Sequence, residues 1–323
     1  MNIHVGASAK AFQIDEAKSG FADDVLAALS HQPKKLSPKY FYDVAGSELF
    51  EQITVLPEYY PTRVELSIQR ERATDIRNFI PPGAALVEFG AGSTTKVRLL
   101  LDVCDFAAYV PVDISGDFLN AQAIALRSDF PALDVHPVTA DFTASFKLPE
   151  AVTAMPKVGF FPGSTLGNFE PHEASGFLRS AREILGSGAR MILGVDLEKD
   201  ERVLSAAYND ASGVTAKFNL NVLVRINREL GGNFDLSGFT HRAIYNRERH
   251  RIEMHLISRK AQTVRVCGRS FHFRAGESIH TESSYKYSLD RFRALAAGSG
   301  WTTKASWTDA AGMFSVHALV ASD

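Results

Sequence analysis

The sequence predicts an α/β protein built on a doubly wound, mostly parallel sheet of seven strands. Between residues 84 and 197, short apolar runs alternate with amphipathic helical stretches. Uninterrupted apolar runs bounded by turns are typical of strands buried on both faces, and their alternation with helices is typical of a parallel sheet. Two more strand-like runs end the chain, so the sheet is expected to finish with an antiparallel pair.

The expected elements follow one another in order along the chain. Strands are predicted at residues 85–89, 108–112, 135–138, 158–161, 191–195, 301–307 and 314–321. Helices are predicted at residues 97–104, 118–127, 173–185 and 289–297. Before the first strand, Thr62 and Glu65 form a capping-box pattern that starts a helix reaching about residue 79, where residues 81–83 (PPG) stop it.

Outside this region the periodicity changes. Residues 21–29 carry a helical apolar stripe, whereas residues 199–287 mix a helical segment with alternating strands, including a hairpin around residues 246–249. We therefore expect two domains. Residues 62–198 and 288–323 form the Rossmann-like sheet domain, and residues 1–61 and 199–287 form a discontinuous α+β domain.

Composition excludes several classes of function. The chain has 323 residues, 45% of them hydrophobic, and a net charge of −2, which leaves no basic field for nucleic acid. No apolar run approaches the roughly 18 residues of a membrane span, and residues 1–11 lack a secretion signal. Cys104 and Cys267 are each expected to be small buried residues in a reducing compartment. The ten histidines show no ligand cluster, so a cytoplasmic protein without a metal is predicted.

The sharpest local motif is the turn after the first strand, residues 86–96 (LVEFGAGSTTK). Gly90 and Gly92 allow a tight turn and bring backbone N–H groups close to a ligand at a helix start. The dinucleotide fingerprint would place a third glycine where Thr95 stands. Glu88, just before the turn, suits a cationic ligand better than a pyrophosphate.

Acidic residues after the next two strands point to a nucleoside-type cofactor. Asp113 is placed to accept ribose hydroxyls, Asp141 to accept an adenine amino group, and Phe142 to cover the ring. Each acid alone is more often a cap or a solvated loop residue, but their order after successive strands favours cofactor binding. The missing third glycine favours S-adenosylmethionine (SAM) over NAD.

The loop after the fourth strand, residues 161–169 (FPGSTLGNF), is expected to face the transferred group, because ligands of open α/β sheets bind beyond the carboxyl ends of the strands. Gly163 can present its backbone to a substrate, and Asn168 offers a donor and an acceptor to a zwitterion. A helix cap before Pro171 is an equally good interpretation of Asn168.

Five segments together resemble one family, the histidine Nα-methyltransferases of ergothioneine biosynthesis. They are residues 38–43 (PKYFYD), 56–63 (LPEYYPTR), 88–92 (EFGAG), 161–168 (FPGSTLGN) and 251–254 (RIEM). The resemblance runs from about residue 36 to residue 313. It implies a methyltransferase sheet that binds SAM and a substrate domain made of the N-terminal segment and the insertion. It also implies methylation of the α-amino group of L-histidine, up to the trimethylated betaine hercynine.

The resemblance also implies roles for individual residues. Asn168 and Tyr208 hold the substrate carboxylate, and Tyr42, Tyr59 and Gly163 surround the amino group, so that Tyr42, Gly163 and Asn168 are the catalytic set. Glu282 and Ser284 read the imidazole, with Met254 against its ring. The cofactor contacts are Glu88, Gly90, Gly92, Lys96, Asp113, Asp141 and Phe142. Independently of the family, Glu282 and Ser284 alternate along a strand, so both point to one face and can satisfy two ring nitrogens.

Three other functions stay open from the sequence. Relatives that methylate tryptophan derivatives should alter the ring-reading pair, whereas here both Glu282 and Ser284 are present, which favours histidine. A nicotinamide oxidoreductase would use the same fold, and a non-catalytic amino-acid-binding protein would retain it. For the favoured function we expect a monomer whose partner is a small molecule.

Overall fold

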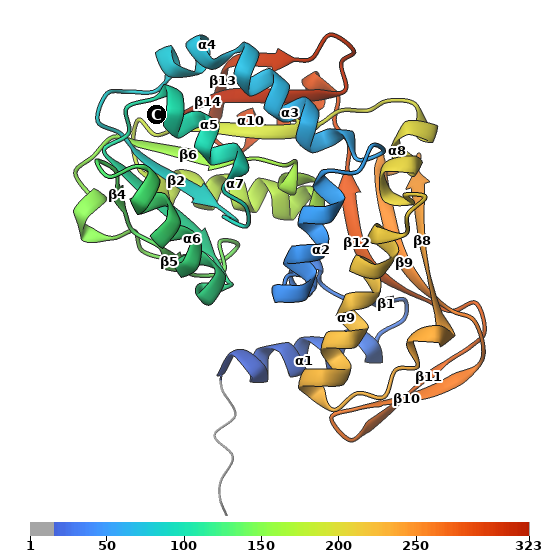
Figure 1. Cartoon of the computed structure of the whole chain (residues 1–323). Helices are drawn as coiled ribbons and strands as arrows, with labels where there is room; N and C mark the ends of the chain where they lie inside the picture. The colour runs from blue at the N-terminus through green and yellow to red at the C-terminus, as the bar shows by residue number, and fades with distance from the viewer. Residues whose placement is uncertain (1–15, 323) are drawn as a thin grey trace, which may run out of the picture.

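The structure is a computed structural model of the chain and describes residues 16–322. Residues 1–15, which include the segment examined for a secretion signal and the start of the expected 1–61 segment, lie outside the described residues. Figure 1 shows two parts side by side: the parallel sheet with its helices, and a second sheet made of β8, β9 and β12.

The larger sheet has the strand order β13-β14-β7-β6-β2-β3-β4, and β5 also pairs with β3. Its inner pairs are parallel, while β14 runs antiparallel to both β7 and β13. The strands are β2 (Ala85–Phe89), β3 (Ala108–Asp113), β4 (Asp134–Val135), β5 (Val138–Thr139), β6 (Lys157–Phe161), β7 (Arg190–Asp196), β13 (Trp301–Thr308) and β14 (Phe314–Ala321). The predicted mostly parallel sheet with a closing antiparallel pair is confirmed.

The predicted strand at residues 135–138 is two short strands. β4 and β5 pair with β3 in one continuous register, with Tyr109 opposite Val135 and Val112 opposite Val138. That register places Pro111 opposite Pro137, and neither proline has an N–H to give to the ladder. The ladder is therefore interrupted at this point.

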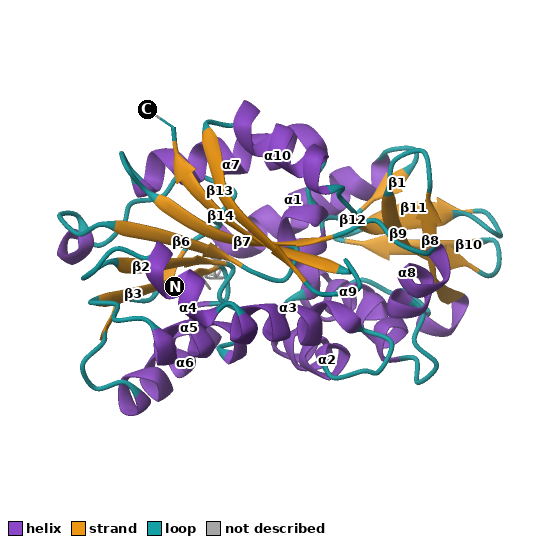
Figure 2. Ribbon diagram, turned by 90° about the horizontal axis from the view of Figure 1, so that it is seen from above, coloured by secondary structure: helices purple, strands orange, loops and turns teal. Residues whose placement is uncertain are grey.

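Helices cover both faces of the sheet, as Figure 2 shows. One apolar cluster joins one face to α3 (Tyr60–Glu71), α4 (Ala73–Phe79), α5 (Thr95–Val103) and α6 (Gly116–Asp129). A second cluster joins the other face to α7 (Pro171–Leu185) and α10 (Leu289–Gly298). Leu86 belongs to the first cluster and Val87 to the second, because successive strand side chains point to opposite faces.

The predicted capping box at Thr62 is wrong. Helix α3 begins at Tyr60 with Pro61 in its first turn, where the missing proline N–H costs no hydrogen bond, and it ends at Glu71 before the separate α4. Glu65 is 1% exposed and bonds to residues outside its helix. Its carboxylate is therefore unavailable as a cap.

The second part holds a sheet of order β1-β12-β9-β8 and a separate β10–β11 hairpin. The strands are β1 (Lys34–Lys35), β8 (Phe239–Asn246), β9 (Arg251–Ser258), β10 (Gln262–Val266), β11 (Arg269–Phe273) and β12 (Ser278–Tyr285), and the helices are α1 (Glu16–Ser30), α2 (Val44–Thr54), α8 (Glu201–Tyr208) and α9 (Val214–Leu230). One apolar cluster contains residues from both chain segments, and the rings of Phe41 and Phe218 lie 4.7 Å apart within it. This packing supports the proposed discontinuous domain.

The two cysteines differ in their environment. Cys104 is buried, as expected, but Cys267 is exposed, so its expected burial is wrong. Cys267 and Gly268, with φ of 48° and 75°, form the turn between β10 and β11, and a hairpin turn of this kind projects its side chains away from the core. Within residues 16–322, no helix combines the length and apolarity that a membrane crossing requires.

Candidate active site

The glycine turn after β2 is held against the end of β3. The N–H groups of Gly90 and Ala91 both donate to the carbonyl of Val112, at 2.8 and 3.0 Å. Gly90 has φ of +77°, and a Cβ added there would lie 3.2 Å from the Phe142 ring. At Gly92, no described atom lies within 4 Å of the place of a Cβ. The turn therefore leaves open space beside it, as a cofactor cradle requires.

The predicted acidic residues lie at the same edge of the sheet. Asp113 ends β3 and accepts the Ser115 N–H at 2.9 Å, and burial raises its pKa. Asp141 accepts the Thr143 N–H at 2.9 Å through Oδ1. The Phe142 ring packs with its centroid 5.7 Å from that of Phe161. These carboxylates and this ring stay the proposed contacts for ribose and adenine.

Glu88 has a different environment from the one expected. It is buried, and the Tyr109 hydroxyl donates to it from the neighbouring strand. Burial raises the pKa of Glu88 to about 8, although the Tyr109 hydrogen bond opposes this. In the ligand-free protein at neutral pH, Glu88 is therefore mostly uncharged. Its proposed role near the cofactor then rests on hydrogen bonding rather than on a negative charge.

An ion pair joins the cofactor turn to the loop after β6. Lys96, at the start of α5, lies 2.6 Å from Glu65, measured from Nζ to Oε2. The same carboxylate accepts the Gly163 N–H at 2.9 Å. A Cβ on Gly163 would lie 3.0 Å from Lys96 Nζ. The sequence-predicted Lys96 and Gly163 are thus adjacent, and Glu65, which the prediction missed, bridges them.

The loop itself depends on its two glycines. Gly163 and Ser164 both have positive φ, of 81° and 60°. A Cβ on Gly167 would lie 2.7 Å from the backbone oxygen of Tyr285, so only glycine lets the loop pack on β12. Asn168 ends the 3-10 helix η3 (Thr165–Asn168), and Glu170 is the N-cap of α7. The interpretation of Asn168 as the helix cap is therefore wrong.

A pocket lies between this loop and the second sheet. All eight residues predicted around the substrate line it, namely Tyr42, Tyr59, Gly163, Asn168, Tyr208, Met254, Glu282 and Ser284. The residues that complete its wall are Phe50, Ile53, Ser164, Thr165, Ala207, Thr215 and Phe218. Segments far apart in the sequence therefore converge on one pocket.

Strand β12 aims two polar groups into the pocket. Its pairing with β9 shifts register between His280 and Glu282, and beyond this irregularity Glu282 and Ser284 both line the pocket. Met254 is the direct partner of Glu282 on β9. The one-residue shift decides which face these side chains occupy. The expected alternation of Glu282 and Ser284 is confirmed.

Three tyrosines among the polar residues of the pocket are uncharged. Burial raises the pKa values of Tyr42, Tyr59 and Tyr208 well above their ordinary value, so they stay phenols. Burial also raises the pKa of Glu282 to about 7, while the charge of Lys286 lowers it. Within residues 16–322, no group of three or more histidine, cysteine or acidic residues is arranged to hold a metal ion.

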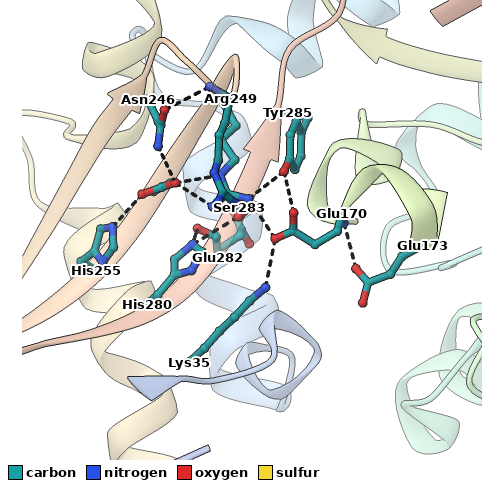
Figure 3. A network of polar contacts seen from close by, with 12 residues as sticks. Lys35, Glu170, Glu173, Asn246, Arg249, His255, His280, Glu282, Ser283 and Tyr285 are labelled. Carbon is teal, nitrogen blue, oxygen red and sulfur yellow. Dashed lines mark hydrogen bonds and ion pairs between the residues drawn. The ribbon is translucent and has the colours of Figure 1, made fainter. Parts of the chain in front are cut away.

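On the opposite face of β12, a polar network connects the second sheet to α7 (Figure 3). Glu170 accepts from Arg251 Nη1 at 2.8 Å, from the Tyr285 hydroxyl at 2.6 Å and from Lys35 Nζ at 3.1 Å. Burial alone would raise the pKa of Glu170, but hydrogen bonds from Tyr285 and Lys35 and the charge of Arg251 lower it to about 2. The network holds the end of the 163–168 loop against the pocket sheet.

A second buried network lies behind the pocket and was also missed from the sequence. Asp196 ends β7 and pairs with Lys199 at 2.6 Å and with Lys286 at 2.7 Å, and the Tyr60 hydroxyl donates to it at 2.8 Å. A carboxylate at the carboxyl end of a strand is a signal that could have identified Asp196. Lys286 carries no comparable local signal.

A glycine turn with open space, two carboxylates at successive strand ends and an adjoining small-molecule pocket define a SAM-dependent methyltransferase on a doubly wound sheet. A family model described as "Histidine-specific methyltransferase, SAM-dependent" matches residues 21–321. The chain belongs to this family.

Curated relatives agree with this assignment. The chain is 41% identical to the histidine N-alpha-methyltransferase of Mycolicibacterium smegmatis, over 95% of this chain and 96% of that protein. It is 40% identical to the histidine N-alpha-methyltransferase of Mycobacterium tuberculosis, over 90% of this chain and 92% of that protein. It is 30% identical to the ergothioneine biosynthesis protein 1 of Neurospora crassa, over 85% of this chain but only 32% of that protein.

Proposed function

We propose that this protein transfers methyl groups from SAM to the α-amino nitrogen of L-histidine, up to the trimethylated betaine hercynine of ergothioneine biosynthesis. The observation that carries the proposal is the single pocket. It combines Glu282 and Ser284, suited to an imidazole, with Asn168, suited to a zwitterion. The neighbouring Lys96–Glu65–Gly163 contact joins this pocket to the glycine turn.

In this proposal the protein mainly orients and desolvates the substrate. SAM supplies a methyl group activated by its sulfonium. Asn168 and Tyr208 hold the substrate carboxylate, and Tyr42, Tyr59 and Gly163 surround the amino group. Alignment of this kind contributes up to roughly 7–11 kcal/mol to lowering the barrier.

The amine must be neutral to form the new N–C bond. An α-amino group has a pKa of roughly 8 or above, so its proton can pass to water without a strong dedicated base. The raised pKa values of Tyr42 and Tyr59 keep both as phenols, which place the amine or a water beside it. As methyl groups accumulate, the tyrosine faces stabilise the resulting cation.

The test is incubation of the enzyme with SAM and a panel of amino acids, followed by mass spectrometry. Histidine should gain up to three methyl groups, while phenylalanine should gain none under the same conditions. Preferred methylation of a tryptophan derivative would contradict the proposed substrate, and no turnover of any amino acid would support a non-catalytic binding protein. Membership of a SAM-dependent family sets aside the nicotinamide oxidoreductase.

We also propose that the enzyme is a cytoplasmic monomer. A molecular mass near 35.4 kDa from light scattering would support the monomer, and a mass twice as large would contradict it. Cell fractionation tests the compartment.

A further inference from the structure

Lys286 is a buried charge that the proposed reaction leaves without a role. It lies immediately after β12 and is 0% exposed. Its ammonium donates to Ser284 Oγ at 2.8 Å and to the Tyr208 hydroxyl at 3.0 Å, and it pairs with Asp196 Oδ2 at 2.7 Å. Two of these three partners line the pocket.

The three contacts use the whole hydrogen-bonding capacity of the ammonium, which has three donors and no acceptor. Ser284 and Tyr208 must therefore both turn an oxygen lone pair toward Lys286. Each hydroxyl keeps one hydrogen, and the positive charge orients that hydrogen away from itself. The buried cation thus controls the polarity of two hydroxyls in the pocket wall.

The consequence differs between the two hydroxyls. The Tyr208 hydroxyl donates to Ser284 Oγ at 2.8 Å, so Ser284 accepts twice and only its own hydrogen is left for a ligand. When Tyr208 turns its hydrogen to a bound carboxylate, Ser284 still accepts from Lys286. Ser284 therefore keeps its role as a donor when the substrate binds.

The Lys286 ammonium is not an unpaired charge, because the carboxylate of Asp196 pairs with it. Asp196 is also fully buried and contacts Lys199 and Tyr60 in addition to Lys286. Buried ion pairs are costly and are often replaceable by apolar residues without loss of stability. The network pairs the charge of Lys286 and contacts Ser284 and Tyr208 in the pocket wall. Its role is therefore assigned to substrate recognition rather than to stability.

We propose that Lys286 is a positioning residue that fixes Ser284 as a hydrogen-bond donor toward the substrate ring. Ionised Glu282 is an acceptor, so the pair offers one donor and one acceptor. It selects a neutral imidazole in a single tautomer over an imidazolium and over rings that lack an acceptor nitrogen. This inference rests on the proposed function, since it assumes that histidine occupies the pocket.

The first experiment uses the unaltered enzyme. Histidine labelled with ¹⁵N in the ring is bound in the presence of S-adenosylhomocysteine at pH 7.5, and its ring nitrogens are observed by NMR. We expect one protonated and one unprotonated nitrogen in a single tautomer. An imidazolium, or two tautomers in rapid exchange, would overturn the proposal.

The second experiment is a double-mutant cycle read as histidine affinity by calorimetry, with S-adenosylhomocysteine at saturation. K286M should weaken histidine binding at least tenfold, but less than threefold in an S284A background, because the effect passes through Ser284. Affinity for S-adenosylhomocysteine should stay within twofold. Equal losses in both backgrounds would show that Lys286 acts through the fold or through Tyr208 rather than through Ser284, and would overturn the proposal.

If K286M does not fold, the variant K286M/D196N/K199M carries the same test, because it removes Asp196 together with both of its buried cationic partners. Failure of the proposed function is seen separately. A wild-type enzyme that neither binds nor methylates histidine contradicts the function itself, whereas a wild-type enzyme that methylates histidine together with additive effects in the cycle overturns only the role of Lys286.

Discussion

At the scale of single residues, Glu282 is the group on which we propose that ring recognition depends. Burial raises its pKa to about 7 in the ligand-free protein, so it ionises only as the pH rises through that value. An ionised carboxylate accepts a ring N–H, and a protonated one is a poorer acceptor. The affinity for histidine should therefore change near neutral pH because of this one side chain.

We expect E282Q to weaken histidine binding by a factor of about 10 to 100, because a hydrogen bond to a charged group contributes roughly 1.5–3 kcal/mol. Wild-type affinity should rise as the pH increases from 6 to 8, and the rise should be smaller in E282Q. Calorimetric titrations at several pH values measure both effects. Unchanged affinity for histidine in E282Q would contradict the assignment of Glu282 as a residue that binds the imidazole ring.

Glu88 gives a prediction about stability. Its pKa is raised from 4.5 to about 8, so its contribution to stability is fully present below pH 4.5 and is lost as the pH rises through about 8. The loss amounts to at most about 1.4 kcal/mol per pH unit in this window. E88Q cannot ionise but can still accept from Tyr109, so it should become more stable than the wild type as the pH increases.

Urea unfolding at pH 5, 7 and 9 tests this expectation. The free energy of unfolding of E88Q minus that of the wild type should increase steadily across the series. E48Q, at an exposed position, is the matched control and should show no such trend. A constant difference for E88Q would mean that Glu88 is already ionised in the folded protein.

At the scale of elements, the loop after β6 connects the proposed cofactor site to the proposed substrate site. Its residue Gly163 has a left-handed backbone and gives its N–H to Glu65 of helix α3. The same carboxylate holds Lys96 of helix α5. A disturbance of the loop should therefore reach both binding sites.

G163A should reduce kcat/KM at least tenfold, because the new Cβ would lie 3.0 Å from Lys96 Nζ. G231A is the control. Gly231 has φ of +61° and ψ of +32°, in the left-handed α region, and no described atom beyond its chain neighbours lies within 4 Å of the new Cβ, so the variant carries backbone strain of about 1–2 kcal/mol without such a contact. Equal losses of activity in the two variants would show that only strain matters at Gly163.

At the scale of the whole molecule, the active site depends on how the two sheets are held together. Glu170 connects Arg251 and Tyr285 of the second sheet to the start of α7 (Figure 3). Its pKa is lowered to about 2, so this stabilisation is present above pH 4.5 and is lost as the pH falls from there toward 2.

E170Q should therefore lower the free energy of unfolding at pH 7 by about 2–3 kcal/mol, and the difference from the wild type should shrink below pH 4. It should also raise the KM for histidine more than the KM for SAM, because Asn168 lies two residues away. E183Q, exposed on the same helix, should change neither quantity. Denaturant unfolding and steady-state kinetics measure these effects, and equal changes in both KM values would contradict a local role for Glu170.

Much of this molecule could be predicted because its signals are local. Apolar runs identified the sheet strands, the Gly90–Gly92 turn identified the cofactor edge, and the alternation of Glu282 and Ser284 placed both on one face. Family resemblance added Tyr42, Tyr59 and Tyr208, which no periodicity would have identified. Local patterns gave a wrong prediction at two places. The strand predicted at residues 135–138 is divided in two at a pair of prolines, and Glu65, assigned to a helix cap, contacts Gly163 instead.

The sequence by itself therefore determined the fold class and the strand order along the chain, because backbone geometry and hydrophobic burial act over a few residues. The side chains that line the pocket were predicted mainly through the family resemblance. Only the tertiary structure decided the partners of the buried charges, Glu65 with Lys96 and Lys286 with Asp196. Such pairs join residues far apart in the sequence, so no periodic pattern of residues predicts them. They form only where packing removes water and forces each charge to find a partner.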